Sequence, residues 1–135
     1  MTRKIRRHCF EYNHLRMKLE VWYSKTLTIT EMDKILGNVY PETNEIFTTI
    51  NLENCAALTI TPINGKMFML LNFDSTVADI HHESIHIATH IFDYIGQPHT
   101  MDSDEFFAYT STSIFEDILK LIKNKFKVNL KLLVE

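Results

Sequence analysis

Four histidines and a glutamate lie within the ten residues HHESIHIATH, from His81 to His90. Residues four apart on an α-helix face the same way, with Cβ atoms about 5–6 Å apart, so His82 and His86 can both bind one ion. Each imidazole nitrogen would lie about 2.0–2.1 Å from a zinc ion. Glu83 stands between them, where it can take a proton from a water molecule. This H-E-x-x-H pattern predicts a hydrolytic zinc site.

Two histidines do not complete a catalytic zinc site, which uses three protein ligands and one open position. The next predicted helix begins with DEFFAY, and Glu105 lies on its first turn. An antiparallel helix after a short turn is expected to bring Glu105 beside the two histidines as the third ligand. Tyr109 follows one turn later and would lean over the site. The predicted set is His82, His86 and Glu105 for zinc, with Glu83 and Tyr109 as catalytic residues.

Each of these features also has an ordinary structural explanation. H-E-x-x-H is a short pattern, and the 7 histidines of the chain raise its chance of arising without function. His90 shares the face of His82 and His86, where it is either a spare ligand or a surface or supporting histidine. Acidic residues such as Asp104 and Glu105 also stabilise the N-terminus of a helix through its dipole.

The first half of the chain predicts strands and one short helix. Residues 15–23 alternate apolar and charged side chains, as a half-buried strand does. Residues 28–37 begin with a T-x-x-E capping box and end at Gly37, which predicts a helix. Residues 56–73 form two apolar runs around Asn64-Gly65, a strong hairpin signal, and Pro62 suggests an edge position or a bulge.

From Asp74 the apolar spacing becomes helical. Asp74 or Ser75 is expected to cap a helix that ends at Gly96, and a second helix is expected over about 104–125. The tail 127–135 is either a final strand or an arm. This order predicts one α+β domain over residues 1–135, in which a small antiparallel sheet packs against the H-E-x-x-H helix and a second, glutamate-bearing helix.

Composition narrows the class of protein. The 135 residues carry 14 basic and 17 acidic side chains, a net charge of −3, so nothing indicates a nucleic-acid-binding surface. The basic start MTRKIRRH is not followed by an apolar run, so neither a signal peptide nor a membrane span is expected. Two cysteines, Cys9 and Cys55, are too few for a disulfide framework, and an intracellular chain is expected.

The stretch HESIHIATHIFDYIG…DSDEFFAY resembles small metallopeptidase-like proteins of tailed bacteriophages. The elements that carry the resemblance are the H-E-x-x-H helix, its D-x-x-G ending at Asp93 and Gly96, and the downstream E-x-x-A-Y at 105–109. The resemblance is loose over residues 15–122 and specific over about 80–109. It implies a minimal gluzincin-like (zincin-like) arrangement. One departure is that the acid-binding histidine and C-terminal lobe of larger thermolysin-like enzymes cannot be identified here.

Two functions follow from this resemblance and the motif. The first is a zinc-dependent phage peptidase that acts on virion or host proteins, with strand 67–73 holding an extended peptide by edge pairing. The second is a non-catalytic virion structural or assembly protein that keeps the fold and a structural zinc. Expected partners are therefore a peptide or protein substrate, or other phage structural proteins within a larger complex. The expected location is the host cytoplasm during infection, or the virion.

Overall fold

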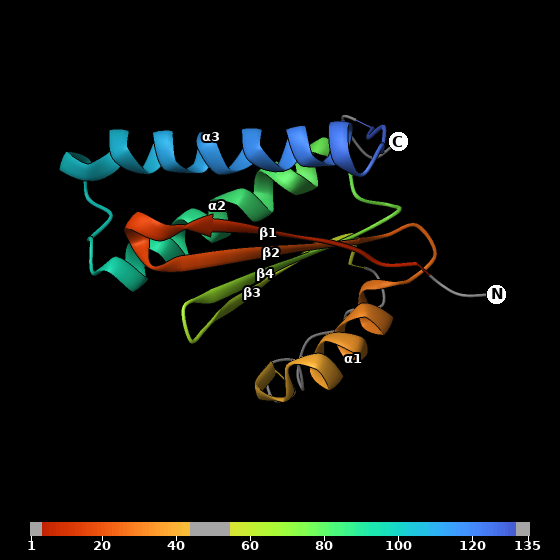
Figure 1. Cartoon of the computed structure of the whole chain (residues 1–135). Coiled ribbons are helices and arrows are strands. Elements are labelled where there is room, and N and C mark those ends of the chain that lie inside the picture. The colour runs from red at the N-terminus through yellow and green to blue at the C-terminus, as the bar shows by residue number, and fades with distance from the viewer. Residues whose placement is uncertain (1–3, 44–54, 132–135) are drawn as a thin grey trace. The chain divides into compact units, whose positions relative to one another are not determined.

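The computed structural model describes residues 4–43 and 55–131. The chain divides into two compact units, one ending at Ser75 and one beginning at Thr76. In the described residues, the first unit holds a four-stranded sheet and the helix α1, and the second holds the long helices α2 and α3 (Figure 1). The fold is therefore α+β, as predicted. None of the described helices is long and apolar enough to cross a membrane.

The sheet is mixed, not antiparallel as expected. Its strands lie in the order β1 (Arg6–Tyr12), β2 (Met17–Ser24), β4 (Lys66–Asn72) and β3 (Ala57–Ile63). β1 pairs antiparallel with β2, and β3 pairs antiparallel with β4, whereas β2 and β4 run parallel. Parallel neighbours need a crossover connection, and α1 (Ile29–Val39) lies within it. Sequence alternation could not reveal this pairing, because it does not encode strand direction.

The position of β4 overturns one sequence-based expectation. β4 has β2 on one side and β3 on the other, paired along its length. Its backbone is therefore already engaged on both edges. The expectation that strand 67–73 holds an extended peptide by edge pairing is wrong.

The β3–β4 hairpin follows the prediction. Asn64 has φ 52° and Gly65 has φ 77°, and a two-residue type I′ turn requires positive φ at both of its central positions. Pro62 falls where the strand register shifts, between Ile60 and Ile63. β3 is an edge strand, which is where a sheet tolerates proline.

The other hairpin was only half anticipated. β1 was not predicted, although its residues alternate between half-buried and exposed, because charged side chains mask that pattern in the sequence RRHCFEY. β2 was predicted as a half-buried strand, but all of its residues except Lys18 are buried. Its polar residues Glu20 and Ser24 are buried with the apolar ones, and both make hydrogen bonds.

α1 supplies the cover for one face of the sheet. The Thr28 hydroxyl accepts a hydrogen bond from the Glu31 N–H at 3.2 Å, and the Glu31 carboxylate accepts one from the Thr28 N–H at 3.3 Å, so the predicted capping box is present. The helix does not end at Gly37 but continues to Val39. Its apolar side chains join those of the sheet in one core cluster: Trp22, Leu27, Ile29, Met32, Leu36, Ile60, Phe68 and Leu70.

A buried carboxylate lies beside this core. Glu20 is 7% exposed and accepts hydrogen bonds from the Trp22 indole and, at 3.0 Å, from the Tyr40 hydroxyl. The Lys66 ammonium group donates to the same carboxylate at 3.5 Å. Burial alone would lower the pKa of Lys66, but its contacts with Tyr40 and Glu20 outweigh burial and raise that pKa. The pairing offsets the cost of burying a charge.

The second unit begins with α2 (Val77–Ile95), the helix that carries the histidines. Its cap is Thr76, not Asp74 or Ser75 as expected. The Thr76 hydroxyl accepts from the Asp79 N–H at 3.1 Å, and the Asp79 carboxylate accepts from the Thr76 N–H at 2.9 Å. This capping box satisfies two N–H groups that lack partners within the helix, and it defines where the helical register of the histidines begins.

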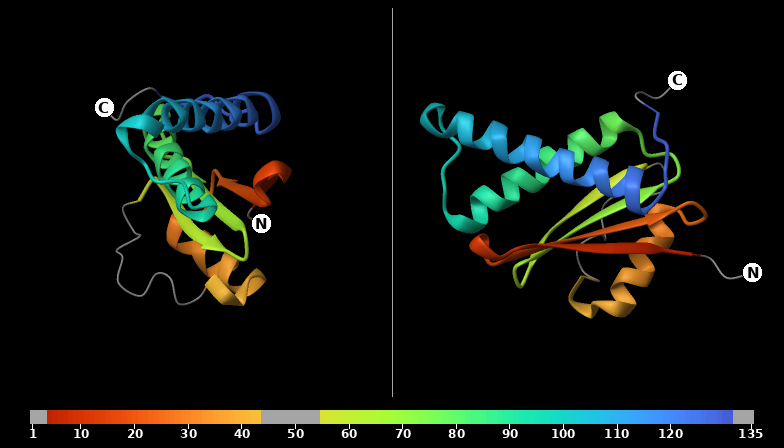
Figure 2. Two further views of the ribbon diagram at one scale, coloured as in Figure 1. Left: turned by 90° about the vertical axis from the view of Figure 1, so that its left-hand side faces the viewer. Right: turned by 45° about the horizontal axis from the view of Figure 1, so that its top comes forward.

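The remainder of the second unit agrees closely with the sequence. Gly96 ends α2 with φ 71°, a conformation that favours glycine. α3 (Asp104–Lys120) continues into a π-helical turn, η4 (Leu121–Lys125), so the predicted helix over 104–125 is confirmed. α3 runs back antiparallel to α2 (Figure 2). Residues 127–131 form no helix or strand, and the rest of the tail lies outside the described residues.

Replacing Thr76 by alanine should destabilise α2. Thr76→Ala removes the hydroxyl that accepts the Asp79 N–H, and loss of such a cap lowers the free energy of unfolding by about 1 kcal/mol. Urea denaturation followed by circular dichroism measures this loss. Thr76→Ser keeps the hydroxyl and is the matched control, so equal destabilisation by both substitutions would contradict a capping role.

Candidate metal centre

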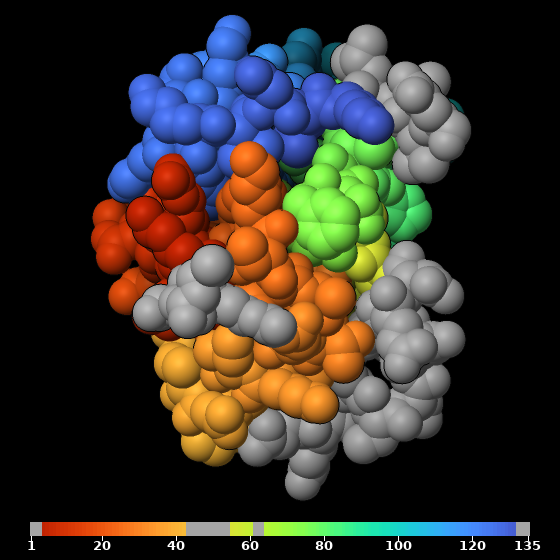
Figure 3. Space-filling view, turned by 90° about the vertical axis from the view of Figure 1, so that its right-hand side faces the viewer, coloured from red at the N-terminus to blue at the C-terminus, as the bar shows by residue number. Residues whose placement is uncertain are grey.

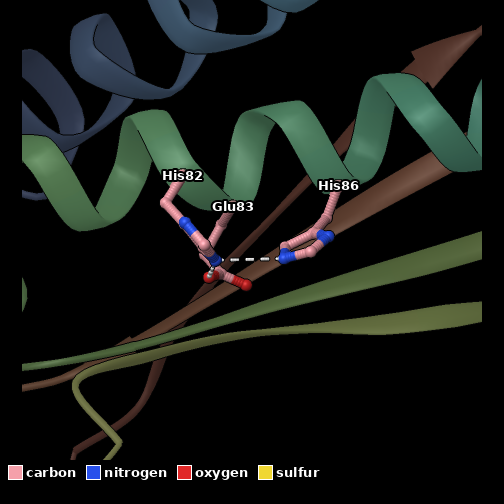
Figure 4. A group of neighbouring side chains, drawn as sticks. All are labelled: His82, Glu83 and His86. Atoms are coloured by element: carbon pink, nitrogen blue, oxygen red, sulfur yellow. Dashed lines mark hydrogen bonds and ion pairs between the residues drawn. The ribbon is translucent and has the colours of Figure 1, made fainter.

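His82, Glu83 and His86 come together on one side of α2, as their helical spacing predicts. Figure 4 shows the three side chains extending from the same side of the helix. The two Nε2 atoms of His82 and His86 lie 3.1 Å apart, and an oxygen of Glu83 lies 3.9 Å from Nε2 of His82. One ligand atom from each residue falls within 4.8 Å of the others. The group therefore has the spacing that a bound ion needs.

The three side chains differ in exposure. The His82 side chain is 70% exposed, whereas that of Glu83 is only 9% exposed. His86 is exposed as well. The imidazoles are thus open to an incoming ion or water molecule. The carboxylate, in contrast, is held in a buried position at their edge.

The short distance between the imidazoles has two chemical explanations. One ring can donate an Nε2–H hydrogen bond to the Nε2 of the other, and 3.1 Å suits such a bond. Both nitrogens can instead bind one zinc ion, because ligands that each lie about 2.0–2.1 Å from the metal can be 3.1 Å apart. Imidazole and carboxylate are ordinary zinc ligands, so the residues fit this metal.

Glu105 does not join this group. The rings of Phe106 and Phe107 lie 5.0 and 5.1 Å from that of Phe92, whereas Phe115 lies 5.3 Å from His81. The start of α3 therefore lies beside the end of α2. Phe92 is ten residues beyond His82, about 15 Å along a helix.

The expectation that an antiparallel helix returns Glu105 to the histidines is thus not met. The turn after Gly96 is short, so the first residues of α3 face the last residues of α2 and not its beginning. Among the described residues, the histidine pair gathers no acidic group other than Glu83. The metal-binding role of Glu105 remains a prediction without support from this geometry.

Tyr109 and His90 are the other residues that the sequence placed at or near the site. Tyr109 lies on α3 and is 68% exposed, and its catalytic role stays a prediction. His90 is half-buried one turn beyond His86. Burial chiefly, and the neighbouring His86 in addition, lower the pKa of His90, while Asp93 acts in the opposite direction. His90 therefore favours its neutral form and is a neighbour of the candidate site, not a member of it.

The remaining histidines of this unit make aromatic contacts. His81 lies edge-on to Phe115 at 5.3 Å, and His99 stacks on Phe107 at 4.0 Å. His99 also lies 3.3 Å from a carboxylate oxygen of Asp104. In the described part of the chain, no second group of three acids, histidines or cysteines is close enough to hold an ion.

Comparison with known proteins does not assign the chain to a family. No protein-family model, no curated protein and no solved structure matches it. The case for a function therefore rests on the chemistry of the three residues on α2.

Zinc binding should depend on both histidines. His82→Ala and His86→Ala should each abolish stoichiometric zinc, because each removes one of two imidazole ligands. Glu105→Ala, which removes a carboxylate from α3, should leave zinc content unchanged. Elemental analysis of the purified, zinc-equilibrated proteins measures this directly. Loss of zinc in Glu105→Ala would contradict the separation of Glu105 from the histidine pair.

Proposed function

We propose that the chain is a zinc-dependent hydrolase of the metallopeptidase type, in which His82 and His86 hold the metal. The observation that supports this most is the 3.1 Å separation of their Nε2 atoms beside the Glu83 carboxylate. When bound, zinc would supply a Lewis acid that polarises a carbonyl group and lowers the pKa of water. In this proposal the chain is a minimal zincin-like protein, and its substrate is a peptide or protein.

Glu83 is the residue that distinguishes a catalytic site from a simple ligand pair. It adjoins His82 in sequence, and its carboxylate lies 3.9 Å from the His82 Nε2, close enough to accept a proton from a water molecule between them. The same group can then return the proton to the leaving amine. Because the Glu83 side chain is buried, it keeps its position without the disorder of a surface carboxylate. A structural ion needs no base at this position.

Catalysis by zinc would require a third protein ligand beside the two histidines. Catalytic zinc sites usually have three, and Glu105 is not gathered with the histidines. This observation favours a second candidate function, a phage structural or assembly protein that keeps the helix pair without the chemistry. In that case the two imidazoles form a hydrogen bond or hold an ion loosely. The host cytoplasm and the virion are the proposed locations for the two functions.

Glu83→Gln separates the two functions. Glutamine keeps the shape of the side chain but cannot accept the proton, so an enzyme should lose turnover by about 10²–10⁴-fold. Zinc content and the thermal unfolding midpoint should remain those of the unaltered chain. The measurement is cleavage of a mixed peptide library with mass-spectrometric detection, with zinc content measured on the same samples.

Glu105→Gln is the matched control, because it makes the same chemical change on α3. It should leave cleavage unchanged. If the unaltered, zinc-loaded chain cleaves no peptide in the library, the peptidase proposal fails and the assembly function is favoured. If Glu83→Gln cleaves as well as the unaltered chain, Glu83 is not the base.

A further inference from the structure

The strand β1 is an open edge of the sheet in the part of the chain that the structure describes. It stands at one end of the strand order and pairs there with β2 alone. That pairing runs from Arg6 to Tyr12 without a register shift. The opposite edge, β3, is interrupted between Ile60 and Ile63. Regular edge strands present unpaired N–H and C=O groups that can pair with another strand, so β1 is the better docking edge.

One face of β1 carries a short, ordered charge pattern. Arg7, Cys9 and Glu11 are its exposed residues, whereas the alternate residues are half-buried. Arg7 lies over the ring of Trp22, with its guanidinium carbon 5.0 Å from the ring centroid. Glu11 lies 3.9 Å from the Lys18 ammonium group. The positive charge of Arg7 therefore lies two residues before Cys9, and the negative charge of Glu11 lies two residues after it. Both side chains contact residues of β2.

This pattern is complementary to itself. When two identical strands pair antiparallel around a two-fold axis at Cys9, Arg7 faces the partner's Glu11 and Glu11 faces the partner's Arg7. An axis at His8 would instead set Arg7 opposite cysteine, and an axis at Phe10 would set Glu11 opposite cysteine. Of these three registers, only the one centred on Cys9 pairs opposite charges.

We propose that β1 is a homodimerisation edge, at which a second copy of this chain pairs antiparallel with Cys9 on the two-fold axis. The sheet then continues from one copy into the other. Opposite charges that face each other across antiparallel strands strengthen pairing, and like charges weaken it. A two-fold interface repeats each contact, so any change at Arg7 or Glu11 acts twice. Figure 3 shows residues of β1, in red, at the surface of the first unit.

Charge exchange tests this register. Arg7→Glu places two like-charged pairs in the interface, and Glu11→Arg does the same with positive charges. Each should weaken dimerisation by about tenfold or more, measured by sedimentation velocity over a concentration series. An equimolar mixture of the two variants should form a heterodimer, because the acidic side chains of one copy then face the basic side chains of the other at both positions. The double variant R7E/E11R should dimerise as the unaltered chain does.

Lys25→Glu is the control for net charge, because Lys25 is exposed and lies outside β1. It should dimerise normally, and circular dichroism should show that all variants fold. The proposal is overturned if the unaltered chain stays monomeric at several hundred micromolar. It is also overturned if neither charge reversal weakens dimerisation, or if an equimolar mixture of the two variants forms no heterodimer.

Cys9 provides an independent measure of the register. Directly opposite residues in antiparallel strands have Cα atoms about 4.5–5.5 Å apart, within the range that a disulfide spans. In a Cys55→Ser background, added diamide should accept two electrons and two protons from the paired Cys9 thiols and give a covalent dimer. Non-reducing electrophoresis detects it. Adding Arg7→Glu should suppress the covalent dimer, and oxidation that is equally fast in that variant would contradict the proposed register.

Discussion

The parallel pairing of β2 with β4 is the constraint from which the arrangement of the first unit follows. Each of these strands also belongs to a hairpin, so joining them side by side makes both of them interior and leaves β1 and β3 as edges. Residues that alternate along β2 are buried on both of its faces, such as Glu20 and Trp22 on one face and Leu19 and Val21 on the other. This burial explains why Glu20, on this strand, must have hydrogen-bond donors around it. The parallel pair further requires a crossover, and α1 within that crossover covers Trp22 and its neighbours.

The candidate metal centre depends on a much smaller part of the molecule. Its three side chains come from five consecutive residues of one helix, so the geometry that brings them together is that of the α-helix itself. The cap at Thr76 and the glycine at 96 fix the extent of that helix. Such a site can survive large changes elsewhere in the chain. For the same reason, it has few ligands, because a single helix face cannot surround an ion.

This difference explains how much could be predicted. The histidine cluster, the Asn64-Gly65 turn and the capping box at Thr28 are local, and a short stretch of sequence determines each. The position of Glu105 relative to the histidines depends on how α3 packs against α2. That packing involves aromatic contacts at Phe92 and cannot be read from spacing along the chain. The parallel direction of β4 relative to β2 likewise depends on contacts between segments that are far apart in the sequence. β1 was not predicted, because charged residues such as Arg7 and Glu11 are typical of exposed loops. Their alternation becomes meaningful only when β1 pairs with β2, which places them together on the exposed side of the strand.

The first turn of α2 has a further connection within its own unit. The Val77 N–H donates a hydrogen bond to the carbonyl oxygen of Lys131 at 2.7 Å, so the segment that follows η4 returns to the start of the histidine-bearing helix. Local opening of protein structure proceeds in cooperative segments of unequal stability. Detachment of residues 127–131 would remove the acceptor from a helix-terminal N–H and loosen the turn that precedes His82. The Val77 amide is consequently a natural reporter, in hydrogen exchange, of how tightly that segment holds the helix.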